Sequence, residues 1–191
     1  MGESAPAAHG MYMTTSPFGR RPNAGFSLIE LMVVLAVSIV LLGSAIPTVL
    51  TARQRMALDG SIHDVAAAVQ TARLQALSSG RTMRVRFNCP AAGQFRVVEV
   101  TGSASIDAAA NRCDPAAYPY PDPDAANRPD LDGPVRVLRA GVLFSAATNV
   151  DIAPSGRVTP ATGNAPVSIS VLKNNATQTL TLSASGRISF Q

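Results

Sequence analysis

Histidine, lysine and cysteine are scarce in this chain of 191 residues, and tryptophan is absent. His9 and His63 are the only histidines, so a Ser-His-Asp site would depend on one of them, and nothing marks a nucleophilic serine. Two cysteines without a histidine cluster make a poor zinc site. The sequence therefore predicts a protein that is not an enzyme and has no metal, cofactor or small-molecule substrate. His63 is expected on the surface or in helix packing.

Charged side chains are also few. The chain has 16 Lys and Arg against 12 Asp and Glu, which gives a formal net charge of +4. Lys173 is the only lysine, so arginine supplies nearly all of the positive charge. The excess is modest and scattered along the chain, and it does not by itself indicate a nucleic-acid partner.

The one long apolar run extends from Phe26 to Ile46, and as a helix these 21 residues span roughly 30 Å, the thickness of a bilayer core. Arg20 and Arg21 precede it, so the positive-inside rule predicts a cytoplasmic N-terminus and a periplasmic remainder. A secretory signal has a shorter apolar region with its small residues behind it. Here Gly25 lies in front of the run, which disfavours an ordinary signal peptide.

Glu30 is the only carboxylate within that run. A charge inside a membrane costs at least ~2.5 kcal/mol at the centre and less toward the end, so such a residue is a functional candidate. The run contains no lysine or arginine to pair with it. The expected partner is therefore a cation that another chain supplies when it packs alongside.

The sequence Gly25-Phe26-Ser27-Leu28-Ile29-Glu30 resembles the N-terminus of type IV prepilins and type II secretion pseudopilins. The resemblance implies that a prepilin peptidase and methyltransferase removes the leader, residues 1–25, by cutting between Gly25 and Phe26, and that it methylates the new N-terminus. It also implies that Glu30 pairs with the Phe26 amino group of its own or a neighbouring subunit during assembly. Pro47 fits as well, because the family often has a proline near the end of the apolar segment.

A second helical stretch follows the membrane run. Its apolar residues recur at spacings of three and four, at Leu58, Ile62, Val65, Val69, Ala72 and Ala76. Gly80 follows this stripe and suits a left-handed C-cap, so the predicted helix covers residues 26–80, with 26–46 in the membrane. Pro47 lacks an N–H group and clashes with the preceding turn, so it is expected to kink or weaken the helix.

Beyond Gly80 the pattern changes to short runs that are typical of β-strands. They are Arg81–Phe87, Gln94–Val100, Val135–Leu138, Val142–Ala146, Val167–Leu172, Gln178–Leu182 and Arg187–Phe190. Asn174-Asn175 and Ser185-Gly186 are predicted hairpin turns. Residues 81–191 are expected to form a β-rich periplasmic head, and the whole chain an α+β, pilin-like fold with the long helix packed on antiparallel sheet.

Residues 101–134 form an insertion rich in proline and aspartate between the second and third predicted strands. Loops of this length are usually functional or disordered, so the insertion is expected to be flexible and its Tyr118–Asp132 part mobile. Four carboxylates gather there and have the oxygen ligands that calcium prefers, namely Asp122, Asp124, Asp130 and Asp132. Their order does not match an EF-hand, so a solvated acidic loop is favoured over a calcium site.

Cys89 and Cys113 both lie in the exported region, where thiols meet an oxidising compartment. One disulfide between them is predicted. The alternatives are a metal pair and a reactive thiol, and neither has support in the sequence. Closing a loop of about 25 residues would stabilise the fold by roughly 3 kcal/mol on the chain-entropy model.

The head is similar to the H-type pseudopilin domain, which the minor pilins FimT and FimU share. The residues that carry this resemblance are Ile152-Ala153-Pro154-Ser155-Gly156-Arg157 and Ser185-Gly186-Arg187-Ile188. The resemblance implies a minor pseudopilin of the type II secretion system, anchored by one helix in the inner membrane. Together with other pseudopilins it would assemble into a periplasmic pseudopilus that exports folded proteins. A minor pilin that initiates or tips a type IV pilus is the alternative.

A pilin for DNA uptake is a third hypothesis, because some FimT-like pilins bind DNA through a C-terminal Gly-Arg-x-Arg motif. Here the positions read Gly186-Arg187-Ile188-Ser189, so the second arginine is missing. Phosphate binding rests on several basic residues acting together. Arg187 is therefore more simply explained as a solvating charge at a strand edge, and a nucleic-acid partner is not expected.

Overall fold

The computed structural model describes residues 25–121 and 129–191. The chain forms two compact units, Met1–Ser44 and Ala45–Gln191. One long helix, α1 (Leu28–Ser79), begins in the first unit and ends in the second. Nearly all the other elements of the second unit are antiparallel strands, so the predicted α+β class is confirmed.

The first unit contains the apolar beginning of α1. The helix is long and apolar enough to cross a membrane, and its apolar stretch is not buried in protein. The hydroxyl of Ser38 donates to the carbonyl of Val34 over 2.7 Å, so this polar group is satisfied within the helix, as the lipid interior requires. The features of this segment are those of a membrane anchor.

Helical structure continues through Pro47, which lies in the second unit. The hydroxyl of Thr51 lies 3.2 Å from the Pro47 carbonyl, one turn back, and donates to it. The weakening of the helix that the proline predicts stays a prediction.

The remainder of α1 carries the apolar stripe of the second unit. All six stripe residues are buried, and Ile62, Val65, Ala72 and Ala76 are wholly inaccessible to solvent. The helix ends where the sequence indicates. Gly80 has a φ of +69°, and its N–H donates to the carbonyl of Ala76 over 3.1 Å. This is the left-handed C-cap that glycine favours.

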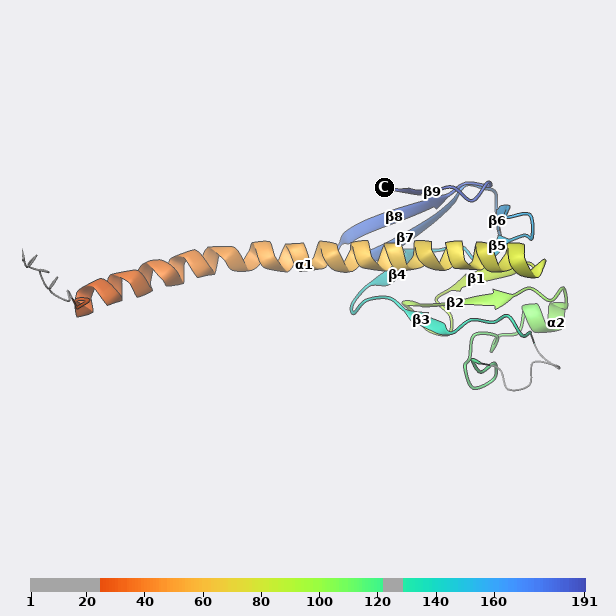
Figure 1. Cartoon of the computed structure of the whole chain (residues 1–191), viewed down its shortest axis with the longest axis horizontal. Coiled ribbons are helices and arrows are strands. Elements are labelled where there is room, and N and C mark those ends of the chain that lie inside the picture. The colour runs from red at the N-terminus through yellow and green to blue at the C-terminus, as the bar shows by residue number, and fades with distance from the viewer. Residues whose placement is uncertain (1–24, 122–128) are drawn as a thin grey trace, which may run out of the picture. The chain divides into compact units, whose positions relative to one another are not determined.

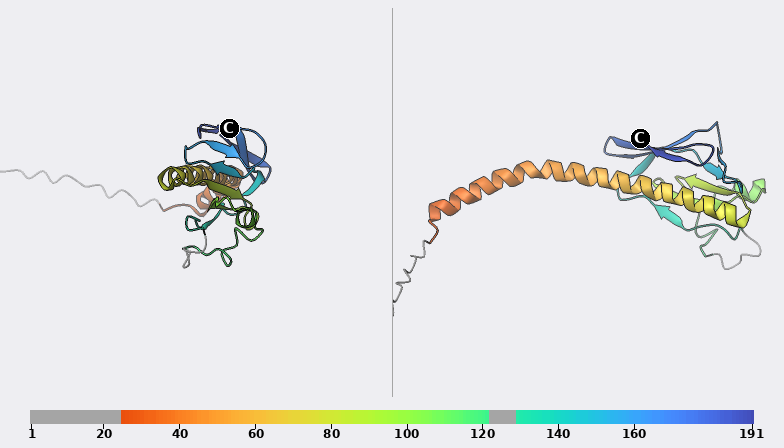
Figure 2. Two further views of the ribbon diagram at one scale, coloured as in Figure 1. Left: turned by 90° about the vertical axis from the view of Figure 1, so that its right-hand side faces the viewer. Right: turned by 45° about the horizontal axis from the view of Figure 1, so that its top comes forward.

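Two antiparallel sheets pack along this stripe. The five-stranded sheet has the order β3-β2-β1-β5-β6, and its strands are β1 (Met83–Phe87), β2 (Gln94–Glu99), β3 (Val135–Val137), β5 (Val150–Ile152) and β6 (Val158–Pro160). The four-stranded sheet has the order β4-β7-β8-β9, with β4 (Leu143–Ala146), β7 (Val167–Lys173), β8 (Ala176–Leu182) and β9 (Ile188–Phe190). In Figure 1, β7–β9 lie above the yellow end of α1 and β1–β3 below it, and the end-on view of Figure 2 shows the same division.

Alternate residues of the central strands fill the core between sheets and helix. Met83 and Val85 of β1 and Ile169 and Val171 of β7 are fully buried in one cluster with the α1 stripe. This alternation is the period of two that a sheet with one dry face requires.

The seven predicted strands are all present, with ends shifted by at most two residues. The sequence pattern does not predict β5, β6 or the single-turn helix α2 (Ala104–Asp107). The Asn174-Asn175 turn is also present, and both residues have the positive φ of a type I′ turn.

Two other hairpin turns share the sequence Ser-Gly-Arg and the same backbone hydrogen bond. In the first, the Gly156 N–H donates to the Ala153 carbonyl over 2.8 Å. In the second, the Gly186 N–H donates to the Ser183 carbonyl over 2.9 Å. Both glycines have φ values near +80°, which L side chains rarely adopt. The Ser-Gly-Arg repeats are therefore explained by turn chemistry.

Hydrogen bonds form within the described parts of the insertion and connect it to the rest of the head. The N–H of Thr101 and that of Gly102 both donate to the Asp107 carboxylate, which fixes the chain around α2. At its far end Asp132 is buried, and its carboxylate accepts from the Glu99 N–H of β2 over 2.9 Å. The contacts at Asp107 are exposed and the one at Asp132 is buried. The flexibility of the insertion and the mobility of Tyr118–Asp132 stay predictions. Asp122 and Asp124 lie outside the described residues.

Cys89 and Cys113 form a disulfide in the structure, with their Cα atoms 5.5 Å apart. Both residues are buried. The bridge joins the end of β1 to the first half of the insertion, 24 positions further along the chain.

Candidate functional site

The N-terminal segment places its three predicted site residues at the start of α1. Gly25 and Phe26 precede the helix, and Phe26 is 81% exposed. Glu30 lies in the first helical turn, where the partial positive charge of the helix N-terminus favours a carboxylate. Its side chain is exposed and forms no ion pair with any residue in the described ranges. The carboxylate is thus available to a neighbouring chain.

The five-stranded sheet has one face toward α1, and a layer of arginines lies on its other, second face. Met83, Val85 and Phe87 face α1, so Arg84 and Arg86 of β1 lie on the opposite face, together with Arg96 of β2. The insertion covers this face, and Arg96 is only 1% exposed. Its Nε donates to the Gly133 carbonyl over 2.7 Å. Arginines are rarely buried unless they are paired, so this layer is the most unusual feature of the head.

Arg112 is the centre of this layer. It is fully buried and forms a two-pronged ion pair with the carboxylate of Asp132, while its Nη2 also donates to the Glu99 carbonyl. The Tyr118 ring lies 4.6 Å from its guanidinium carbon, as in a cation–π contact. Burial lowers the pKa of the Arg112 guanidinium from its ordinary value, although an arginine still remains charged at neutral pH.

Two further arginines form three ion pairs with the surrounding carboxylates. Arg84 is bonded to Asp151 of β5 over 2.5 and 2.8 Å, and these hydrogen bonds raise the pKa of the Arg84 guanidinium. Arg81 is bonded to both Glu99 and Asp130, over 3.0 and 2.6 Å. None of these ion pairs was predicted from the sequence.

Two members of the predicted acidic cluster, Asp130 and Asp132, lie in the described part of the chain. Asp130 and Asp132 are bonded to different arginines, and no group of three or more metal-ligating side chains is present among the described residues. The two aspartates instead help to hold the end of the insertion against the sheet.

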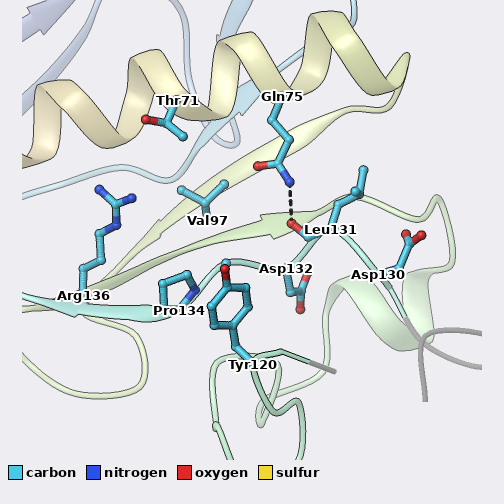
Figure 3. A pocket seen from close by; sticks show the side chains of 10 residues that line it. Thr71, Gln75, Val97, Tyr120, Asp130, Leu131, Asp132, Pro134 and Arg136 are labelled. Atoms are coloured by element: carbon cyan, nitrogen blue, oxygen red, sulfur yellow. Dashed lines mark hydrogen bonds between the residues drawn. The ribbon is translucent and has the colours of Figure 1, made fainter. Parts of the chain in front are cut away.

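A cavity of about 340 Å³ lies where the insertion meets α1 and β3. Figure 3 shows its wall, with Thr71 and Gln75 on the helix and Tyr120, Asp130 and Leu131 on the insertion. Gln75 donates to the carbonyl of Leu131 over 3.0 Å. The contact attaches the insertion to the helix as well as to the sheet.

Arg187 is exposed beside the second Ser-Gly-Arg turn. Arg73 of α1 lies against both turns: a Cβ on Gly156 would fall 3.0 Å from its guanidinium, and one on Gly186 would fall 2.8 Å from it. Arg73 also lines a shallow pocket with Arg157. The sequence did not single out Arg73, whose contact with both turns depends on long-range folding.

His63 is exposed on α1, as predicted. Its Nδ1 lies 2.8 Å from the Asp59 carbonyl, and its ring stacks on Phe190 of β9 with centroids 4.7 Å apart. The ring thus helps to attach the C-terminal strand to the helix, which is the packing role expected for it.

Two family models match the sequence. The prokaryotic N-terminal methylation motif matches residues 20–46, and the type II transport protein GspH model matches residues 61–186. The chain belongs to the GspH family. This family comprises structural pilins and pseudopilins rather than enzymes, and the methylation motif implies prepilin processing and assembly into a filament.

Solved structures of two relatives resemble the GspH-family chain. The type IV minor pilin FimU of Pseudomonas aeruginosa is 18% identical with a TM-score of 0.47, over 72% of this chain and 90% of its own. The minor pseudopilin EpsH from the type 2 secretion system of Vibrio cholerae is 14% identical with a TM-score of 0.43, over 70% of this chain and 95% of its own. No curated protein matches the chain significantly.

We predict that Arg112→Met destabilises the head by about 3–5 kcal/mol, because it leaves the Asp132 carboxylate buried without its cation. Thermal unfolding followed by circular dichroism should show a Tm lower by about 10 °C. The double variant Arg112→Met/Asp132→Leu should recover most of that loss, because it removes both charges. Asp130→Asn is the matched control: it breaks an exposed pair, worth about 1 kcal/mol or less. Equal decreases in Tm for Arg112→Met and Asp130→Asn would contradict the expectation that breaking the buried ion pair costs more than breaking the exposed one.

Proposed function

We propose that the protein is a minor pseudopilin of the type II secretion system, which assembles with other pseudopilins into a periplasmic pseudopilus for the export of folded proteins. The observation that carries the proposal is the GspH model match, placed directly behind the methylation motif. The exposed apolar segment of α1 supports an anchor in the inner membrane. The arginines before that segment support a cytoplasmic N-terminus, so residues 81–191 would face the periplasm.

Within this proposal the prepilin peptidase removes residues 1–25 and methylates Phe26. Gly25 and Phe26 precede the first turn of α1, and a Cβ on Gly25 would meet no atom within 4 Å. An unstructured, uncrowded peptide bond is one that a protease can reach. The new amino terminus is then five residues from the Glu30 carboxylate, counting both.

Glu30 acts in assembly as a check on axial register. In a bilayer its carboxylate would be costly to bury without a partner. The Phe26 amine of a neighbouring subunit relieves that cost only when the two helices are aligned, since a slip of one turn displaces the groups by about 5.4 Å. Fixing register is the best-attested use of buried polar groups between helices.

Deletion of the gene in its native bacterium tests the function directly. We expect enzymes normally found in the culture medium to accumulate in the periplasm and to return to the medium when the wild-type gene is restored. Normal secretion together with loss of surface pili would contradict this proposal and assign the protein to a type IV pilus. DNA uptake that fails while both other activities persist would assign it to DNA capture.

Processing gives a second prediction. The intact mass of protein extracted from membranes should correspond to residues 26–191 plus one methyl group. Gly25→Leu should retain the leader, because the bulky side chain changes the residue on the amino side of the cut. A mature wild-type chain that begins elsewhere would contradict the proposed cleavage site.

Glu30→Ala gives a third prediction. The variant should still be inserted and processed, but cysteine cross-linking to neighbouring subunits should fall at least about tenfold, because the loss of one well-placed ionic partner exceeds ~1.4 kcal/mol. Ser38→Ala is the matched control in the same helix, since its hydroxyl is satisfied by the Val34 carbonyl. Normal cross-linking of Glu30→Ala would refute the register role.

A further inference from the structure

Arg86 lies in an environment with an excess of positive charge. It is directly opposite Arg96 in the pairing of β1 with β2, and like charges in such a pair destabilise a sheet. Arg84 is its neighbour on the same face. Burial, and then the charge of Arg84, lower the pKa of the Arg86 guanidinium, which stays charged at neutral pH.

Two carboxylates beside this layer are committed to other arginines. Asp151 is bonded to Arg84, and Asp132 is bonded to Arg112. The side chain of Arg86 has no hydrogen bond or ion pair with any residue in the described ranges. Its Nη1 atom is buried and has no hydrogen-bond partner there. Buried donors are usually satisfied, so this guanidinium indicates a site for an acceptor.

Arg86 also lines a pocket of about 500 Å³ beside the disulfide, between the end of β1 and the first half of the insertion. Two asparagines in the wall have their oxygens engaged by the backbone. Asn88 Oδ1 accepts from the Gly93 N–H over 3.3 Å, and Asn149 Oδ1 accepts from the Phe87 N–H over 3.1 Å. In each amide the oxygen is thus engaged, while the NH₂ group can still donate a hydrogen bond to a ligand.

One carboxylate, Asp114, also belongs to the wall, and it accepts from the N–H of Ala116 over 2.8 Å. Its negative charge opposes a dianion such as phosphate more strongly than a monoanion. A planar monoanion also matches the parallel N–H groups of a guanidinium, which bind a carboxylate with two hydrogen bonds.

We propose that the pocket formed by Arg86, Asn88 and Asn149 binds a carboxylate, with the Arg86 guanidinium as its counter-ion and the two asparagine NH₂ groups as additional donors. The carboxylate comes either from an acidic side chain of a neighbouring protein subunit or from a small free acid. The site lies entirely within the head and does not depend on the type of filament.

Thermal unfolding of the full chain in detergent tests the proposal. Melting in sodium acetate is compared with melting in sodium chloride at equal ionic strength, because a ligand of the folded state raises Tm. Acetate at several times its dissociation constant should raise the Tm of the wild type by about 3 °C. The same rise is expected for Arg187→Met, which removes an exposed arginine elsewhere, and no rise for Arg86→Met. No rise in the wild type, or an equal rise in Arg86→Met, would overturn the proposal.

A second measurement does not require the variant to fold. Titration of the wild type with acetate should shift the side-chain NH₂ resonances of Asn88 and Asn149 in an NMR spectrum, and leave those of Asn174, in the exposed hairpin turn, unchanged. Equal shifts at all three, or none, would overturn the site. An acetyl-Gly-Asp-Gly-amide peptide separates the two sources. If the peptide saturates the site at a lower concentration than acetate does, the site is assigned to an acidic side chain. If the peptide needs a higher concentration than acetate, the site is assigned to a small acid.

Discussion

The burial of one face of α1 against two sheets is the constraint on which the rest of the head depends. Neither sheet has more than five strands, and each buries apolar residues in one cluster with the stripe that includes Ile62, Val65 and Val69. A sheet that exposed such a face would associate with other chains. The same helix also supplies the membrane anchor, so one continuous element serves both environments. Arg73 and His63 then attach the C-terminal hairpin and strand to that helix.

The second face of the five-stranded sheet, which points away from α1, is organised by ion pairs. Buried arginines lie on it beside the apolar Val98, and Arg96 and Arg112 are among the largest fully buried residues of the described chain. Ion pairs of this kind add little net stability compared with apolar packing, but they tolerate few alternative arrangements. We infer that they fix where the insertion lies on the sheet, while the apolar core provides the free energy of folding.

The parts of this molecule that could be predicted from sequence are those with a repeating pattern. The α1 stripe, the Gly80 cap and seven strands each show a period or a turn signal over enough residues to be recognised. The Arg112–Asp132 pair could not be predicted, because its members are 20 positions apart and no local pattern relates them. Arg84 and Arg86 alternate correctly, yet no local pattern shows that an insertion covers them. The first residues of α1 are recognisable for another reason, since a carboxylate in an apolar run is rare at any position.

The closed base of the insertion has a consequence for how this family can diversify. The ion pair between Arg112 and Asp132 closes residues 112–132 of the segment into a loop, and the disulfide at Cys113 attaches that loop to the end of β1. Once its ends are joined, a loop can grow at little thermodynamic cost, roughly 0.6 kcal/mol for each doubling of its length. The chain between Tyr118 and Asp130, whose side chains contact Arg112 and Arg81, can therefore change in length at little cost to the strands beneath it. New surface features on the head can arise there, while the helix and both sheets keep the dimensions that a filament requires.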